Sequence, residues 1–128
     1  MRPFLRRRVA LGPGEAWTLL GVGAAVLVDV RTAEAFATAR VPGAVNLPLD
    51  GLDRAGELFD AAASLLVVDA NGQLLRDVVR RLRSQGLHAS EVSGGMTAWR
   101  LTGLPLEGTA HDSPAAGAGT DPRDADGR

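Results

Sequence analysis

The feature that most constrains the fold is a short apolar run followed directly by an amphipathic helical pattern. "SLLVVDA" (64–70) is apolar almost throughout and ends in a carboxylate, which is typical of a strand buried on both faces. "GQLLRDVVRRLRSQG" (72–86) then shows helical periodicity and ends at Gly86, a favourable C-terminal cap. The pattern predicts an inner face of Leu74, Leu75, Val78, Val79 and Leu82, and an outer face of Arg76, Arg80, Arg81 and Arg83.

Two other apolar runs extend this alternation along the chain. "AAVLVDV" (24–30) is predicted to be a second buried strand, and "ASEV" (89–92) a third, short one. Strands that alternate with helices favour a mostly parallel sheet with right-handed crossovers and helices on both faces. The expected fold class is therefore α/β with three layers.

The remaining segments are weaker in pattern but fit this arrangement. Thr32 is a predicted N-cap, and Trp17 and Trp99 lie on apolar helix faces, where core packing is the simplest interpretation. Four further helices are predicted over 13–20, 32–39, 51–63 and 94–103, and Gly56 weakens the helical pattern of the third. Residues 41–49 are predicted to be an extended, turned stretch around a short strand.

The length and composition indicate one soluble domain. The chain has 128 residues, of which 45% are hydrophobic and 23% charged. We expect the domain to cover residues 5–107. Residues 108–128 are rich in Gly, Pro and Asp without apolar periodicity, and are expected to form a disordered tail.

The net charge of −1 offers no electrostatic argument for nucleic acid or a membrane surface as a partner. No apolar run approaches the roughly 20 residues of a spanning helix. The arginine-rich start of segment 1–30 superficially resembles an export signal, but Pro13, Gly14 and Glu15 interrupt its apolar core. The cytoplasm is therefore the expected compartment.

The chain contains no cysteine, which excludes disulfides, thiolate catalysis, iron–sulfur clusters and cysteine-based zinc sites. Its two histidines, His88 and His111, are too few and too far apart in sequence to indicate a metal site. We expect neither a metal nor another cofactor.

In open parallel sheets, the functional crevice lies beyond the carboxyl ends of the strands. That rule selects two loops: Asp29-Val30-Arg31 after one strand, and 69–73 after the other.

Three stretches together resemble the rhodanese-homology family: "LVDVRTAEAFATARVPGAVNLPL" (27–49), the strand-loop-helix over 65–82, and "VSGGMTAWRLTGLPLE" (92–107). They occur in the family's order and at its spacing, and they span nearly all of the chain before the tail. The resemblance implies a three-layer α/β fold with a mostly parallel central sheet.

Family members that act as sulfurtransferases carry a cysteine at the start of the loop after the central strand, where it accepts sulfur as a persulfide. That position falls on Asp69, in the loop Asp69, Ala70, Asn71, Gly72, Gln73 and Leu74. Only Gly72 matches a residue common in the family's loop. Ala70 replaces a frequent arginine, Leu74 and Leu75 replace basic or hydroxyl residues, and Arg40 stands where many members have histidine.

Persulfide chemistry needs a polarizable thiolate, which a helix N-terminus and nearby cations stabilise. A carboxylate is a weak nucleophile toward sulfur and repels anionic substrates. We therefore expect a non-catalytic binding or regulatory module derived from sulfurtransferases, with a protein as its partner. The candidate binding residues are Asp29, Arg31, Arg40 and Asp69.

Two interpretations of Asp69 remain open at this point. Its carboxylate could accept hydrogen bonds from the amides of residues 71–74, because N–H groups at a helix start favour negative charge. The cradle that these amides form would then be filled without a ligand. Alternatively, Asp69 points into solvent and only starts a turn.

Two rival functions also remain. One is an accessory role in sulfur transfer, in which the module docks a persulfide-carrying partner whose own cysteine does the chemistry. The other is a divalent-metal or phosphoryl enzyme built on Asp29 and Asp69, if they face each other across the crevice. Against the latter, Asp29 belongs to the "DVR" signature, where we expect a structural role with Arg31 near Glu34.

Overall fold

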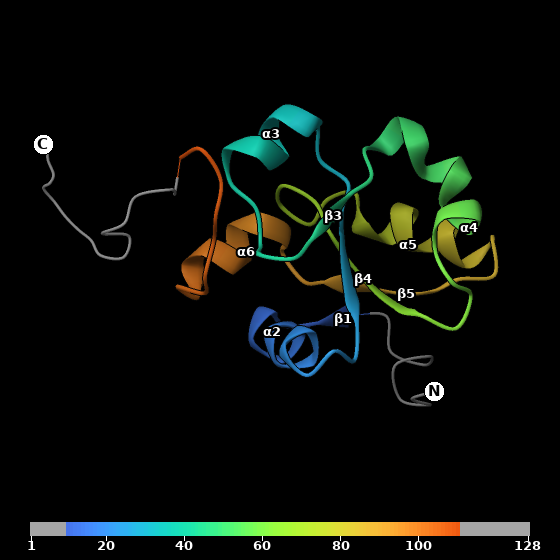
Figure 1. The fold of residues 1–128 in the computed structure, drawn as a ribbon, viewed down its shortest axis with the longest axis horizontal. Helices are drawn as coiled ribbons and strands as arrows, with labels where there is room; N and C mark the ends of the chain where they lie inside the picture. Colours follow the sequence, from blue (N-terminus) through green and yellow to red (C-terminus); the bar gives the residue numbers. More distant parts are fainter. Residues whose placement is uncertain (1–9, 111–128) are drawn as a thin grey trace, which may run out of the picture.

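The computed structural model describes residues 10–110 of the chain (Figure 1). Five parallel strands form one sheet in the order β1-β5-β4-β2-β3. The strands are β1 (Ala10–Leu11), β2 (Val26–Asp29), β3 (Val45–Asn46), β4 (Ser64–Val68) and β5 (His88–Val92). The helices are α2 (Pro13–Gly21), α3 (Ala33–Thr38), η1 (Leu49–Arg54, a 3₁₀ helix), α4 (Ala55–Leu58), α5 (Leu75–Arg83) and α6 (Gly95–Leu101).

The central strand β4 is buried on both faces, as its apolar run predicts. Leu65 and Val67 pack into a core cluster with residues of η1, α4 and α5. Leu66 and Val68 face the opposite way and pack with residues of α2 and α6. The sheet therefore lies between two helical layers (Figure 1), and the predicted α/β class with a parallel sheet is confirmed.

The predicted caps of two helices are confirmed. Thr32 has extended backbone angles and its Oγ1 accepts a hydrogen bond from the Ala35 N–H at 3.2 Å. Gly86 has a φ of +84°, in the left-handed region where glycine carries no Cβ penalty. Helix α3 therefore begins, and helix α5 ends, close to the predicted residues.

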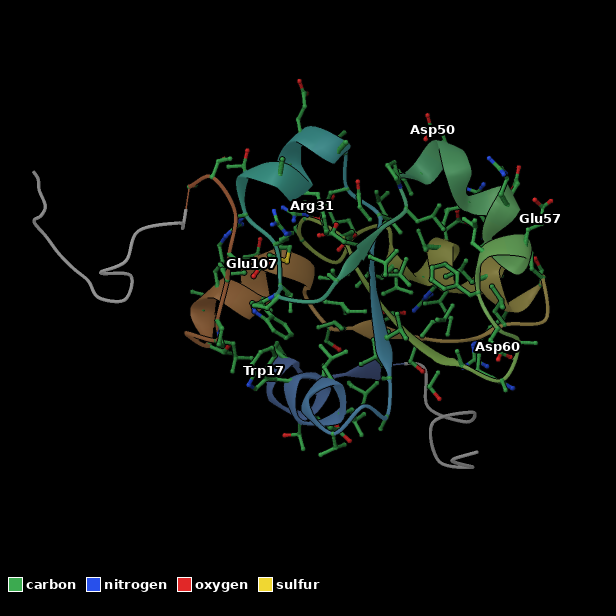
Figure 2. All side chains as sticks on the ribbon, in the orientation of Figure 1. Trp17, Arg31, Asp50, Glu57, Asp60 and Glu107 are labelled. Atoms are coloured by element: carbon green, nitrogen blue, oxygen red, sulfur yellow. The ribbon has the colours of Figure 1, made fainter. Side chains whose placement is uncertain are left out.

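The tryptophan at position 99 is a core residue, as predicted. Its side chain is fully buried, and its Nε1–H donates to the Pro105 carbonyl at 3.2 Å. The Trp17 ring meets it edge-on, with 6.0 Å between the ring centroids, but lies at the edge of the same cluster and is half-buried (Figure 2).

Two local expectations need correction, and one strand was missed. Leu74 does not belong to the inner face of α5, because it precedes the helix and its side chain is 47% exposed. The predicted helix over 51–63 is split into η1 and the single turn α4. Strand β1 was not predicted, because two residues are too short to show periodicity; it pairs with β5 at the edge of the sheet.

Arginines of α5 lie outside the core, as predicted, but are not all simply solvated. Arg80 pairs with Asp77, and Arg81 pairs with Asp53 of η1. Arg83 is half-buried and donates from Nε to the Ala89 carbonyl at 2.8 Å.

The carboxyl end of the described chain is held against α3. Thr109 N–H donates to the Ala37 carbonyl and Ala110 N–H to the Thr38 carbonyl. Most of the tail predicted as disordered, residues 111–128, lies outside the described residues, as do residues 5–9 at the predicted start of the domain. Among residues 10–110, no helix has the length and apolarity that crossing a membrane requires.

We predict that Leu66→Ala lowers the free energy of unfolding by about 3 kcal/mol, because a fully buried side chain of the central strand leaves a cavity. Leu101→Ala is the matched control: Leu101 is 84% exposed on α6, and its truncation should change little. Urea unfolding followed by circular dichroism measures both. Equal losses for the two variants would contradict the assigned core.

Candidate functional site

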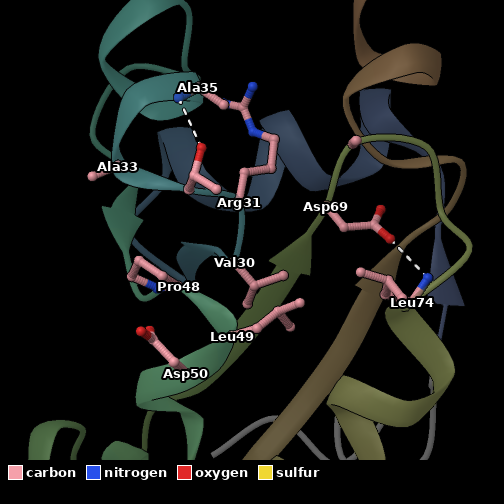
Figure 3. Close-up of a pocket in the computed structure, with 11 residues that line it drawn as sticks. Val30, Arg31, Ala33, Ala35, Pro48, Leu49, Asp50, Asp69 and Leu74 are labelled. Atoms are coloured by element: carbon pink, nitrogen blue, oxygen red, sulfur yellow. Dashed lines mark hydrogen bonds between the residues drawn. The ribbon is translucent and has the colours of Figure 1, made fainter.

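A pocket opens at the carboxyl ends of β2 and β4, where the parallel-sheet rule predicts the crevice (Figure 3). Its volume is about 700 Å³. The walls come from the start of α3, the segment between β3 and η1, and the loop after β4. They include Val30, Arg31, Pro48, Leu49, Asp69 and Leu74.

Asp69 fills the loop that follows β4 with its own carboxylate. One oxygen, Oδ1, accepts the Gly72 N–H at 2.6 Å, and Oδ2 accepts the Leu74 N–H at 2.9 Å. The residue is only 2% exposed. Of the two interpretations left open by the sequence, the structure therefore has the carboxylate turned into the cradle rather than toward solvent.

The loop satisfies a further amide from within. The Asn71 side-chain oxygen accepts the Gln73 N–H at 3.2 Å. Three successive donors, the N–H groups of Gly72, Gln73 and Leu74, are thus occupied by side chains of the loop itself. A loop whose donors are already used has little capacity left to hold an anionic adduct.

The carbonyls of the same loop cap α6. Met96 N–H donates to the Asp69 carbonyl at 2.8 Å, and Thr97 N–H donates to the Ala70 carbonyl at 2.9 Å. These are first-turn donors that have no partner within their own helix. The loop and the start of α6 therefore hold each other in place.

The close approach of α6 to the loop depends on Gly94 and Gly95, which form a tight turn with φ of +78° and +62°. A Cβ at Gly95 would overlap the Asp69 carboxylate and lie 2.8 Å from the Gly72 nitrogen. A Cβ at Gly72, itself at φ +90°, would lie 3.0 Å from Gly94 Cα. Side chains are thus excluded on both sides of this contact.

Asp29 and Arg31 form a buried ion pair beside the pocket. Arg31 Nε lies 3.0 and 3.1 Å from the two carboxylate oxygens, and its Nη2 donates to Oδ2 at 2.7 Å. The Nη2 also donates to the Ala39 carbonyl at 2.6 Å. Asp29 therefore has the expected structural role, with Arg31 as its partner. Within residues 10–110, Arg31 forms no ion pair with Glu34, near which it was expected to lie.

The pair is held by a neighbouring strand. Asn46 Nδ2 donates to the carbonyls of Asp29 and Arg31, both at 3.0 Å. The Arg31 side chain is 9% exposed and that of Asp29 is fully buried. Because both carboxylates have their oxygens engaged, Asp29 with Arg31 and Asp69 with amides, they do not form a shared metal cradle. Residues 10–110 hold no cluster of three or more metal-ligating side chains.

Arg40, the fourth candidate binding residue, does not line the pocket. Its Nε pairs with Glu107 at 3.2 Å, and its guanidinium lies 5.3 Å from the centre of the Phe36 ring. The backbones of Arg40 and Glu107 also exchange hydrogen bonds. Arg40 thus ties the carboxyl end of the domain to the segment after α3. His88, the one histidine in the described part of the chain, begins β5 and so lies at the amino ends of the strands, away from the pocket.

Sequence reasoning missed the third wall of the pocket. Pro48, Leu49 and Asp50 follow β3 and line the pocket. Strand β3 has only two residues, so its carboxyl end could not be placed by periodicity, although the rule that selected the other two loops applies to it as well.

We predict that Asp69→Ala lowers the free energy of unfolding by roughly 3 kcal/mol, because it leaves the amides of Gly72 and Leu74 without their acceptors. Asp50→Ala removes an exposed carboxylate from the same pocket and should leave stability unchanged. Chemical unfolding of both variants tests this. An unchanged free energy of unfolding in Asp69→Ala would show that the amides of the loop do not need the Asp69 carboxylate.

We also predict that Gly95→Ala costs more than about 2 kcal/mol, because the new methyl group meets the Asp69 carboxylate in a backbone conformation that alanine disfavours. Gly14→Ala in α2 is the control, since no atom lies within 4 Å of its added Cβ; it should stabilise by up to about 1 kcal/mol. Thermal unfolding measures both. Equal transition temperatures for the two variants would contradict the close contact between Gly95 and the Asp69 carboxylate.

Comparison with known proteins places this site in a family. The sequence matches the family model described as "Rhodanese-like domain" over residues 12–102. HTH-type transcriptional regulator Rv0324 of Mycobacterium tuberculosis is 37% identical over 87 residues, which cover 66% of this chain and 38% of that protein. The chain therefore spans less than half the length of that relative. Thiosulfate sulfurtransferase GlpE of Actinobacillus succinogenes is 32% identical over 96 residues, covering 74% of this chain and 86% of that protein.

Solved structures agree with the fold. The solution structure of the rhodanese-like domain from the Anabaena Alr3790 protein superposes with a TM-score of 0.73 at 29% identity, covering 83% of this chain and 84% of that one. A rhodanese-related protein from Thermoplasma volcanium has a TM-score of 0.71 at 20% identity, covering 77% and 97% respectively. With the family model, the relatives and the fold in agreement, the chain belongs to the rhodanese-like domain family, as a variant without cysteine.

Proposed function

We propose that this chain is a non-catalytic rhodanese-like module that binds a protein partner and acts in regulation. The observation that carries the proposal is the buried Asp69 carboxylate, which occupies the amide cradle from within. The cradle needs no ligand to be satisfied, and a wide pocket remains open beside it. The proposal places the module in the cytoplasm.

The absence of cysteine from the chain supports this proposal. Relatives named thiosulfate sulfurtransferase match most of the chain, yet the chain has no cysteine at any position to accept sulfur. A carboxylate cannot take that role, because it is a poor nucleophile toward sulfur and repels an anionic donor. At 4 Å, like charges cost on the order of 4 kcal/mol at an effective dielectric constant of 20.

A regulatory role gains support from the relative named as a transcriptional regulator. This chain matches a stretch that makes up 38% of that protein, so a rhodanese-like domain can be one part of a longer regulatory protein. A second candidate function, docking of a persulfide-carrying partner, is favoured by the open pocket beside the loop. It is disfavoured by the Asp69 carboxylate, because a persulfide is itself anionic.

We expect no sulfur transfer from thiosulfate to cyanide by the wild-type chain above buffer background. Asp69→Cys should give at most a feeble rate, because Ala70, Leu74 and Leu75 supply none of the charges that assist family members. Colorimetric detection of thiocyanate measures both, with an active GlpE protein as positive control. Wild-type turnover above background would overturn the non-catalytic assignment.

The binding part of the proposal is tested by capture of partners on immobilised protein from the native host. Leu74→Asp places a charge in the pocket wall and should abolish capture, whereas Leu101→Asp, on the exposed face of α6, should leave it intact. A partner retained equally by both variants would bind somewhere other than this pocket, and no partner at all would contradict the module role.

A further inference from the structure

The pocket has an apolar interior and a net negative charge. This combination favours a ligand other than the anionic sulfur donor of a sulfurtransferase. Val30, Leu49 and Leu74 all line the pocket, and Figure 3 shows Val30 and Leu49 near its centre with Leu74 opposite them, next to Asp69. Leu49 and Leu74 are 38% and 47% exposed. Large apolar side chains left exposed at the rim of a hollow are typical of binding surfaces.

The charges around this apolar floor do not balance. Among the described residues that line the pocket, Arg31 is the only cation, and its charge is neutralised by Asp29. Asp69 has amide partners but no cation. Asp50 is exposed on η1 (Figure 2), and its carboxylate makes no hydrogen bond or ion pair within residues 10–110. Two carboxylates of the pocket therefore have no cation as a partner, which disfavours an anionic ligand and favours a cationic one.

We propose that the pocket binds a segment of a partner protein that inserts an apolar side chain next to a lysine or arginine. The apolar side chain packs on Leu49 and Leu74, and the cation pairs with Asp50 at the rim. This inference rests on the proposed function and gives the partner its chemistry. A pocket of about 700 Å³ has room for a few side chains, within the common range for ligand sites.

The test uses three short capped peptides as probes of the ¹⁵N-labelled protein: Gly-Leu-Lys-Gly, Gly-Leu-Glu-Gly and Gly-Gly-Lys-Gly. We expect the first to bind at least about five-fold more tightly than the second, because a single charge near Asp50 changes sign. The third should bind more weakly than the first, since it lacks the apolar side chain. Chemical-shift changes should centre on the amides of Leu49, Asp50 and Leu74.

Two acidic residues of η1 provide matched variants. Asp50→Lys should reverse the preference between the lysine and glutamate peptides, and Asp50→Asn should weaken it, because only Asp69 then remains negative. Asp53→Asn is the control, because Asp53 is exposed on the same helix but pairs with Arg81 and does not line the pocket. Raising the salt concentration should weaken only the charge-dependent part of the preference.

Preferential binding of the glutamate peptide, or of thiosulfate added as an anionic probe, would overturn the inference. The absence of any chemical-shift change with the lysine peptide at about 10 mM, a concentration well above a Kd of about 1 mM, would overturn it too. These outcomes are separate from the proposed function. Partner capture that depends on Leu74 and a lack of sulfur transfer would still support a non-catalytic module whose partner has another chemistry.

Discussion

The hydrogen bonds from Gly72 and Leu74 to the Asp69 carboxylate are the interaction on which this site depends. The loop leads from β4 into α5, so its N–H groups converge and favour a negative charge at their centre. Here the negative group is covalently part of the loop. The cradle is therefore complete before any ligand arrives, and no ligand has to order it.

The same loop also determines how α6 packs. Its carbonyls accept from Met96 and Thr97, while Gly95 brings the helix against the carboxylate itself. Loss of the carboxylate would therefore disturb two elements, the start of α5 and the start of α6. A wall supported from both sides gives the pocket a defined shape, which is what a binding surface needs to avoid an ordering cost when its partner arrives.

Much of the fold could be predicted because its strongest signals are local. The apolar run of β4 and the helical period of α5 are long enough to be unambiguous, and the Thr32 cap is a side-chain interaction within one turn. Strand β1 and the exposure of Leu74 could not be predicted, because the first depends on pairing with distant β5 and the second on where the loop ends.

The candidate site, like the fold, has features that the sequence predicts and features that it does not. The position of Asp69 follows from strand order and from the resemblance to a family, but its orientation depends on loop backbone angles and on the approach of Gly95, which no local pattern encodes. The role of Asp50 was hidden because β3 is so short. Together these residues connect two properties: the carboxylate that fills the cradle removes the place for sulfur, and with Asp50 it leaves the neighbouring pocket negative. The proposed loss of sulfur transfer and the proposed preference for cations therefore have a common electrostatic origin.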